Sequence, residues 1–486
     1  MLFSSLVFLF TFLPITLLVY YLVPRKVKNV VLLIASLIFY AWGEPVYIFL
    51  MLISILFNYF CGMDIALKAG RKSQVRSLIF TIVVNLFILG FFKYYGFIVT
   101  NLNAILPFYI PYRKLELPIG ISFYTFQTLS YIIDVYRGNV DVQVNLIDFG
   151  TYVTMFPQLI AGPIVQYADV ERQLRERKES LTKFGYGAWF FVMGLAKKVL
   201  LANTIGSIYE NIAAMDGMSV VTAWLGCLAY TFQIYFDFSG YSDMAVGLGK
   251  MFGFEFMQNF NYPYISKSVT EFWRRWHISL GSWFREYVYI PLGGNRVTVP
   301  RHLLNLLIVW FLTGLWHGAS WKYVAFGFWN GMVILVSTLL QPVSDKVVAA
   351  LHIERKSAWY QVFSMLRTFV VVLIGYYFDI ADGFRAAMGM MLKSVTDLHL
   401  SQLRPGAVLE ALPLTRYDWC VLLFGTVVIF TASVIQERSQ RTIREILDEK
   451  CLALRWAVLL AGIFAVVLMG VYGPGVQASE FVYMQF

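Results

Sequence analysis

Long apolar runs separated by short polar or basic segments make up most of this chain. The first run, residues 1–24, contains no lysine or arginine, and the first positive charges, Arg25, Lys26 and Lys28, follow it. A signal peptide carries its charges before the apolar core instead. We therefore expect a retained first membrane helix, with its N-terminus on the non-cytoplasmic side.

Further apolar runs follow, the first two of them shorter than the roughly 20 mainly apolar residues that a membrane-spanning helix needs. They are residues 30–40, 46–60, 78–95, 186–212, 220–236, 323–340, 363–378, 419–435 and 452–471. The Gly-Glu-Pro turn at residues 43–45 divides the first two into a hairpin. The pattern predicts an all-α polytopic integral membrane protein of about ten to twelve transmembrane helices.

Three other segments have a mixed pattern. Residues 115–134 and 153–164 are apolar but contain proline, glycine and polar residues, so each is a full span or a re-entrant segment enclosed by protein. Residues 168–187 are hydrophilic and predict an amphipathic cytoplasmic helix. Without internal repeats or a low-complexity linker, we expect one integral domain, residues 1–486, with N-terminal helices at 1–100, a core at 115–340 and C-terminal helices at 359–486.

Composition supports this class and narrows the partners. The chain is 59% hydrophobic and only 14% charged, which excludes a soluble domain of this length. The net charge of +10 lies in basic clusters between apolar runs, as the positive-inside rule predicts for a lipid bilayer, so we expect no nucleic-acid partner. The four cysteines are scattered without metal-ligand spacing, and we expect no disulfide framework and no metal.

The segment 259–321 stands out because two of the five histidines, His277 and His317, occur there, each beside a tryptophan in apolar sequence. Polar residues at membrane depth are expensive and indicate function. The run from Ser268, with Glu271 three residues on, predicts a capped helix. Helical spacing then places these side chains on one face: Trp273, Trp276, His277, Leu280 and Phe284.

This predicted helix allows two interpretations. It could be an interfacial amphipathic helix whose tryptophans lie at headgroup level and whose arginines meet lipid phosphate. Alternatively it lines a cavity, and Arg274 and Arg275 bind an anionic, phosphate-bearing donor.

The second half of the segment, WFLTGLWHGASW, places His317 at the end of an apolar helix between Trp316 and Gly318. Gly314 and Gly318 would allow another backbone or a ligand to approach closely. His317 could be a satisfied packing residue, but imidazole is the usual general base, and no carboxylate, lysine or cysteine in the same run competes for that role.

Other chemistries find little support. There is no Gly-x-Ser-x-Gly elbow, no HExxH motif and no P-loop. Asp237 and Asp243 do not share one helical face well, so we expect structural roles for them, with Asp237 and Ser239 in a polar stretch of the helix that lines the interior.

Three stretches together, FDFSGYSDMA, the segment from NFNYPY to YIPLGG and TGLWHGASW, resemble the membrane-bound O-acyltransferase (MBOAT) family. The resemblance is to the bacterial branch with alginate O-acetyltransferase and the D-alanyl transferase of teichoic acids. It covers residues 118–329, with echoes in AWGEP and the final FVYMQF. One departure is GYYFDIADGF, where relatives often end an aromatic segment in Phe-Arg and this chain has Asp379; it affects the acceptor side.

The resemblance implies a funnel-shaped helical enzyme with a central tunnel, an acyl thioester donor on the cytoplasmic side and a hydroxyl acceptor on the other. It places the family's essential histidine on His317 and its second histidine on His277. We expect His317 to be the general base, and His277, with Asn261, to orient the donor or stabilise the oxyanion. Arg274, Arg275, Trp273 and Trp316 are the further donor-side residues, and Gly318 is expected to shape the tunnel.

The leading hypothesis is acetyl transfer from acetyl-coenzyme A, or from a carrier phosphopantetheine thioester, to an exported cell-surface polysaccharide, with no tightly bound cofactor. D-alanyl transfer to teichoic acid and, in another class, a polysaccharide channel or flippase are the alternatives. The resemblance also implies a bacterial cytoplasmic membrane location and a separate extracytoplasmic partner of the SGNH type.

Overall fold

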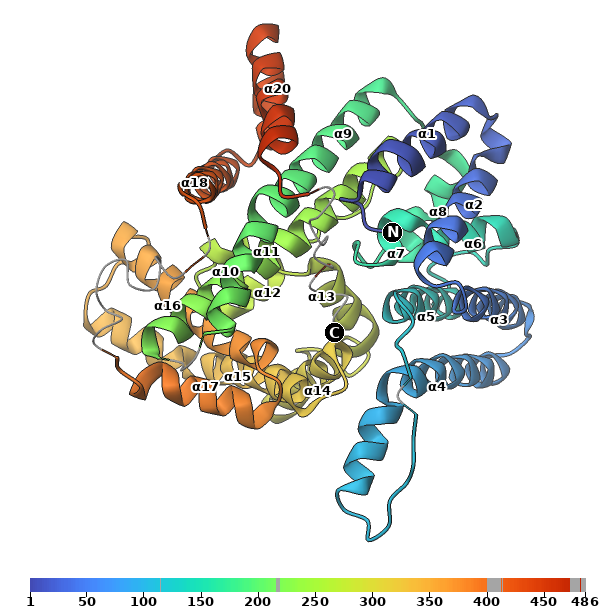
Figure 1. Cartoon of the computed structure of the whole chain (residues 1–486). Coiled ribbons are helices and arrows are strands. Elements are labelled where there is room, and N and C mark those ends of the chain that lie inside the picture. The colour runs from blue at the N-terminus through green and yellow to red at the C-terminus, as the bar shows by residue number, and fades with distance from the viewer. Residues whose placement is uncertain (114, 216–218, 400–411, 413, 473–480, 482–486) are drawn as a thin grey trace.

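The computed structural model describes residues 1–113, 115–215, 219–399, 412, 414–472 and 481 (Figure 1). Throughout these residues the regular structure is helical, so the predicted all-α architecture is confirmed. Of the terminal FVYMQF segment only Phe481 belongs to the described residues, and its side chain is buried. Residues 482–486 lie outside them.

Nine helical segments in the described residues are long and apolar enough to cross a membrane. They are Arg25–Gly43, Ile48–Leu67, Arg71–Asn103, Leu181–Ala213, Val299–His317, Trp321–Ala350, Ala358–Ile380, Arg416–Ser439 and Leu452–Met469. The prediction of about ten to twelve spans also counted residues 1–24 and 220–236. The first contains a shorter apolar helical segment, Phe8–Leu22. The second belongs to a largely buried helix whose polar groups face protein.

The N-terminal half begins with a layer of helices that run to residue 176. They are η1 (Phe8–Phe12), α1 (Leu13–Leu22), α2 (Arg25–Gly43), α3 (Ile48–Leu67), α4 (Arg71–Asn103), α5 (Ile121–Arg137), α6 (Leu146–Thr154), α7 (Phe156–Leu159) and α8 (Tyr167–Glu176). The break between α2 and α3 confirms the predicted turn at Gly-Glu-Pro. The single helix predicted over residues 168–187 is wrong, because the Ser180 side chain accepts a hydrogen bond from the backbone of Lys183 and starts a new helix.

Helix α5 shows how the mixed segment 115–134 folds. It begins only after Gly120, whose φ of 75° is left-handed and whose Cβ position would lie 2.8 Å from the carbonyl oxygen of Leu159. Only glycine fits there without strain. Most side chains of α5 are buried. The segment is therefore a helix enclosed by protein.

The remaining helices carry the candidate site. They are α9 (Leu181–Ala196), η2 (Lys197–Ala202), α10 (Asn203–Ala213), α11 (Val220–Met251), η3 (Pro263–Ile265), α12 (Val269–Arg275), α13 (Ile278–Phe284), η4 (Arg285–Tyr289), α14 (Val299–His317), α15 (Trp321–Ala350), α16 (Ala358–Ile380), α17 (Phe384–Thr396), α18 (Arg416–Ser439), α19 (Ile443–Asp448) and α20 (Leu452–Met469). Helices α10 to α17 form an open ring beside the N-terminal helices, while α18 and α20 stand apart from it (Figure 1).

Glycines allow the backbones of α9 and α11 to approach one another closely. A Cβ at Gly194 would lie 2.3 Å from the carbonyl oxygen of Gly240, and one at Gly187 would lie 2.5 Å from that of Gly247. Small residues at such crossings let two backbones approach inside a membrane, where dispersion replaces the hydrophobic effect as the attraction. This contact fixes α11, the buried helix around which the site is built.

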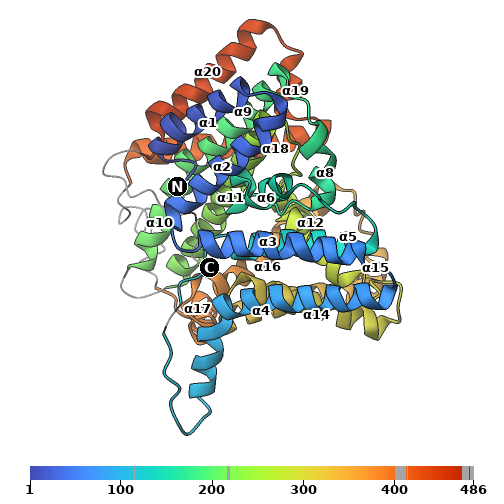
Figure 2. The same ribbon diagram turned by 90° about the vertical axis from the view of Figure 1, so that its right-hand side faces the viewer.

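Helices α4 and α14 overlap in the view of Figure 2, and hydrogen bonds join residues late in each helix. The tyrosine hydroxyl of Tyr94, late in α4, donates to the carbonyl oxygen of Leu315, late in α14, over 2.6 Å. Both helices begin with basic residues, Arg71 in α4 and Arg301 close to the start of α14. His317 lies at the end of α14 opposite this basic start. Basic ends of membrane helices are typical of the cytoplasmic side.

Candidate active site

The helix predicted to run through His277 is interrupted at that residue, and this part of the prediction is wrong. Helix α12 ends at Arg275, α13 begins at Ile278, and His277 has the left-handed φ of 46°. Ser268 does cap α12 by accepting from the amide of Glu271, but the Glu271 carboxylate accepts from the amide of Lys267. The five side chains predicted to share one face therefore do not lie on one helix.

Backbone hydrogen bonds with the loop at residues 259–261, which precedes α12, accompany the interruption. The amide of Ile278 donates to the carbonyl oxygen of Asn259 over 2.9 Å, and the amide of Asn261 donates to the carbonyl oxygen of Arg275 over 2.9 Å. These bonds satisfy backbone groups on either side of His277 that a continuous helix would have paired internally. The left-handed conformation, uncommon for a residue with a side chain, is held by its neighbours and turns His277 out of the helical path.

The side chain of Asn259 holds the histidine and the start of α13 together. Its Oδ1 lies 3.1 Å from Nδ1 of His277 and accepts from the amide of Ser279 at 3.1 Å and from its hydroxyl at 2.9 Å. Because a backbone amide can only donate, the amide of Ser279 identifies the acceptor atom as oxygen. The proton of a neutral His277 then lies on Nδ1, and its Nε2 carries the lone pair. Asn259 and His277 are each 2% exposed.

The two histidines meet at one tryptophan. The Trp316 ring centroid lies 5.6 Å from that of His277 and 5.2 Å from that of His317. Phe238 packs on His277 at 4.8 Å, and Phe326 packs on His317 at 5.3 Å. Folding thus brings together two residues that are far apart in sequence, within aromatic surroundings.

The two arginines predicted to bind the donor have different environments. Arg275 donates to both carboxylate oxygens of Glu437, at 3.0 and 2.8 Å, and to Glu271 at 3.0 Å. The bonds to Glu437 raise the pKa of the Arg275 guanidinium above its ordinary value, so this residue stays charged and committed to joining α12 with α18. Arg274 is exposed.

The other residues predicted on the donor side are divided between the protein interior and its surface. Trp273 donates from Nε1 to Asn330 at 3.1 Å and packs edge-on against Trp310. Asn261 is exposed, and it is its backbone that bonds to Arg275. Its neighbour in the same motif, Asn259, occupies the place beside His277 that the sequence analysis gave to Asn261.

The glycine and acidic residues predicted to be structural have protein partners. A Cβ at Gly318 would lie 2.2 Å from the ring of Tyr323, so the gap is filled by a side chain of α15. Asp237 is 1% exposed and pairs with Lys198 at 2.7 Å, while Asp243 pairs with Lys197 at 2.6 Å.

Ser239 is fully buried on α11, one helical turn from Asp243. The two pairs join α11 to the π-helical turn η2.

Two residues were missed by the sequence analysis. Asn259 gave no local signal that separates it from Asn261. Lys93 did give one, because it is a lysine inside the apolar run 78–95. Its ammonium donates to the carbonyl oxygen of Trp316 and lies 5.6 Å from the centre of that ring.

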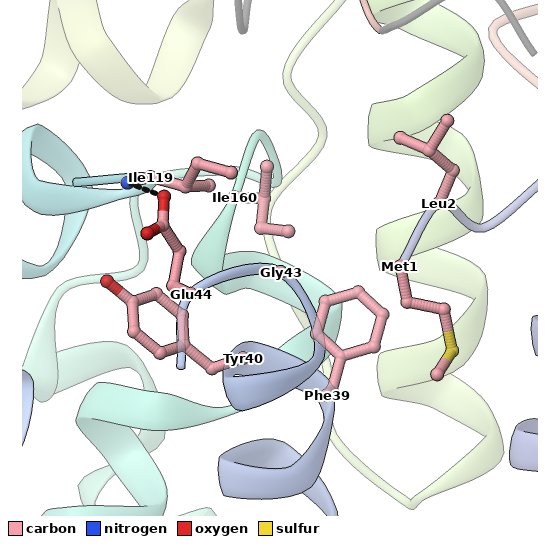
Figure 3. Close-up of a pocket in the computed structure, with 8 residues that line it drawn as sticks. All are labelled: Met1, Leu2, Phe39, Tyr40, Gly43, Glu44, Ile119 and Ile160. Atoms are coloured by element: carbon pink, nitrogen blue, oxygen red, sulfur yellow. Dashed lines mark hydrogen bonds between the residues drawn. The ribbon is translucent and has the colours of Figure 1, made fainter. Parts of the chain in front are cut away.

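A cavity of about 250 Å³ lies at the end of α2, apart from the predicted site residues. Phe39, Met1 and Leu2 form its apolar side, and the Glu44 carboxylate opposite accepts from the amide of Ile119 at 3.0 Å (Figure 3). None of its lining residues is a histidine, so the cavity and the histidine pair are separate features.

The chain is similar to several known proteins over much of its length. The chain is 43% identical over 449 residues to a probable alginate O-acetylase of Azotobacter vinelandii, covering 90% of this chain and 86% of that protein. It is 34% identical over 440 residues to the peptidoglycan O-acetyltransferase of Helicobacter pylori, covering 83% and 82%. With the teichoic acid D-alanyltransferase of Bacillus subtilis it shares 26% identity over 275 residues, covering 53% and 67%.

The family model of the membrane-bound O-acyltransferases matches residues 34–378. That interval contains α2 to α16 apart from the first residues of α2 and the last of α16, and it includes both histidines, Asn259 and Lys93. The relatives named above carry acyl-transfer activities in their names. The chain is therefore a multi-pass membrane acyltransferase and belongs to the membrane-bound O-acyltransferase family.

Proposed function

We propose that this protein transfers an acetyl group from a cytoplasmic thioester to a hydroxyl of an exported cell-surface polysaccharide, or of a partner protein that acetylates it. The observation that carries the proposal is the pair of histidines on Trp316, at the end of α14 opposite its basic start. The longer and closer match to O-acetyltransferases than to a D-alanyltransferase favours acetyl as the acyl group.

His317 accepts the proton of the acceptor hydroxyl as the oxygen attacks the thioester carbonyl. The C–O bond forms, the tetrahedral intermediate collapses with cleavage of the C–S bond, and the thiolate leaves and takes up the proton. The aromatic surroundings of Trp316, Phe326 and Phe238 keep out the water that would hydrolyse the thioester.

His277 fits the role of orienting the donor better than that of stabilising the oxyanion. With the Nδ1 proton directed at Asn259, the neutral ring presents an acceptor at Nε2, whereas an oxyanion requires a donor. An N–H group of a pantetheine arm is the matching donor. The reaction needs no tightly bound cofactor, since acetyl-coenzyme A or a carrier phosphopantetheine thioester is a substrate.

The relatives named above are bacterial, which supports a location in the bacterial cytoplasmic membrane. Transfer to a polymer outside that membrane calls for a partner on the extracytoplasmic side, and an SGNH-type protein fits the role. Arg274, exposed near the turn that carries His277, remains the arginine available to donor phosphates.

The test is transfer from radiolabelled acetyl-coenzyme A in membranes that hold wild-type protein, His317→Ala or His302→Ala. His302 lies on the same helix at its basic end and is the matched control. We expect His317→Ala to lose about 10²–10⁴-fold in rate, the usual contribution of a general base, and His302→Ala to keep it. Full transfer by His317→Ala would exclude the proposal. No label transfer even by the wild type, together with loss of polymer export when the protein is absent, would favour a channel or flippase.

A further inference from the structure

The end of α14 requires hydrogen-bond donors from outside the helix. The helix stops at His317, and Gly318 continues in an extended conformation with φ 179° and ψ 163°. The last four carbonyl groups of an α-helix have no partner within it. Inside a membrane protein such groups are costly unless another segment satisfies them.

Two consecutive side chains of α4 supply these donors. The Lys93 ammonium donates to the carbonyl oxygen of Trp316, and the Tyr94 hydroxyl donates to that of Leu315 at 2.6 Å. A cation at a helix C-terminus is favoured by the helix dipole. Hydrogen bonds from charged donors are also roughly twice as strong as neutral ones.

Lys93 acts on both the backbone and the ring of Trp316. The ammonium lies 5.6 Å from the centre of that ring and 3.4 Å from the hydroxyl oxygen of Ser122 at the start of α5. Among the described residues no carboxylate pairs with it. Its side-chain nitrogen is therefore directed at the residue whose ring contacts both histidines.

The same helix holds the start of α15, just after the turn. Asn101 accepts from Nε1 of Trp321 at 2.8 Å, and the Phe97 ring packs edge-on against that indole with centroids 5.6 Å apart. Helix α4 thus contacts the chain on both sides of the Trp-His-Gly turn. The N-terminal layer is part of the site and not only a scaffold for it.

We propose that Lys93 is a positioning residue for acyl transfer, whose side-chain nitrogen fixes the Trp316–His317 turn so that His317 meets the acceptor hydroxyl in a reactive geometry. This inference rests on the proposed function of His317. A displacement of about 1 Å in a reacting group costs about 10²-fold in rate. A flexible turn would lower the rate of the chemical step while leaving donor binding largely unchanged.

The experiment compares Lys93→Met, Lys93→Arg and Tyr94→Phe in full-length protein, with kcat and donor KM for acetyl-coenzyme A. We expect Lys93→Met to lose about 10–100-fold in kcat with donor KM nearly unchanged. Lys93→Arg keeps a charged donor and recovers most of this loss. Tyr94→Phe removes one neutral hydrogen bond to the neighbouring carbonyl and costs less.

Hydrogen–deuterium exchange of the peptide around residues 313–321 provides a second readout. Lys93→Met is expected to increase exchange there while other helices keep their protection. A wild-type kcat in Lys93→Met, or no recovery in Lys93→Arg, would overturn the inference. If His317→Ala retains transfer, the proposed function itself fails; if it loses transfer and Lys93→Met does not, only the role of Lys93 fails.

Discussion

The side-chain oxygen of Asn259 lies 3.1 Å from Nδ1 of His277 and binds the first turn of α13 through Ser279. This single amide thus fixes both the ring orientation of the histidine and the direction of the helix that follows it. Its amide nitrogen in turn donates to the Ser242 hydroxyl of α11 at 3.2 Å. The position of His277 is therefore tied to the largely buried helix α11.

Replacement of Asn259 by alanine should reduce acyl transfer strongly. The change leaves His277 Nδ1 and the two donors of Ser279 without their acceptor, at a cost of about 1–3 kcal/mol for a buried group. The transfer rate and the thermal unfolding of detergent-purified protein would measure both effects. Asn261→Ala is the matched control, because that side chain is exposed in the same motif. A larger loss in Asn261→Ala than in Asn259→Ala would contradict this assignment.

Arg275 and Arg274 should differ in kind. Arg275→Ala breaks the bonds to Glu437 and Glu271, and we expect a loss of about 1–2 kcal/mol in stability, limited by the partial exposure of the pair. Glu437→Gln should resemble it. Arg274→Ala should leave unfolding unchanged and raise the donor KM. The opposite result, in which Arg275→Ala raises the donor KM and Arg274→Ala lowers stability, would instead support the sequence-based assignment of Arg275 to the donor.

The distribution of hydropathy predicted the helices because each span must satisfy its own backbone inside the bilayer. The same reasoning could not locate the break at His277, which depends on backbone hydrogen bonds with the loop residues Asn259 and Asn261. Local spacing also could not separate Arg274 from Arg275, since Glu437, the partner that distinguishes them, is far away in sequence. Lys93 was detectable, because a lysine within an apolar run is itself a signal.

The thermal stability of the protein should depend on pH through Glu179, which lies in the loop between α8 and α9. Burial opposes ionisation of this carboxyl, but the hydrogen bond from Tyr20 and the contact with Lys28 outweigh it and hold the pKa of Glu179 below its ordinary value. A lowered pKa in the folded state adds stability above the ordinary value, and that stability is lost as the pH falls through the folded pKa. We expect the melting temperature of the wild type to decrease as the pH is lowered beyond about 5.

Glu179→Gln tests this pH dependence. It keeps the size of the side chain but cannot ionise, so the part of the acid destabilisation that belongs to Glu179 should disappear. Glu176, an exposed carboxyl at the end of α8, serves as the control, and Glu176→Gln should retain the wild-type slope. Equal slopes in Glu179→Gln and the wild type would show that other carboxyls govern the acid limb.

The ion pair between Asp237 and Lys198 should be costly to break from one side only. Both side chains are buried, 1% and 8% exposed, and the pair ties α11 to η2. Asp237→Leu leaves the buried ammonium without its carboxylate, which costs about 3–5 kcal/mol. An apolar pair of similar size avoids that penalty, so Lys198→Met combined with Asp237→Leu should recover much of the stability.

The neighbouring pair of Asp243 and Lys197 is more exposed, 28% and 16%, and Asp243→Leu should cost less. Thermal unfolding of the four proteins decides the matter: if the double variant is no more stable than Asp237→Leu, the charge balance of this pair is not what holds α11 to η2.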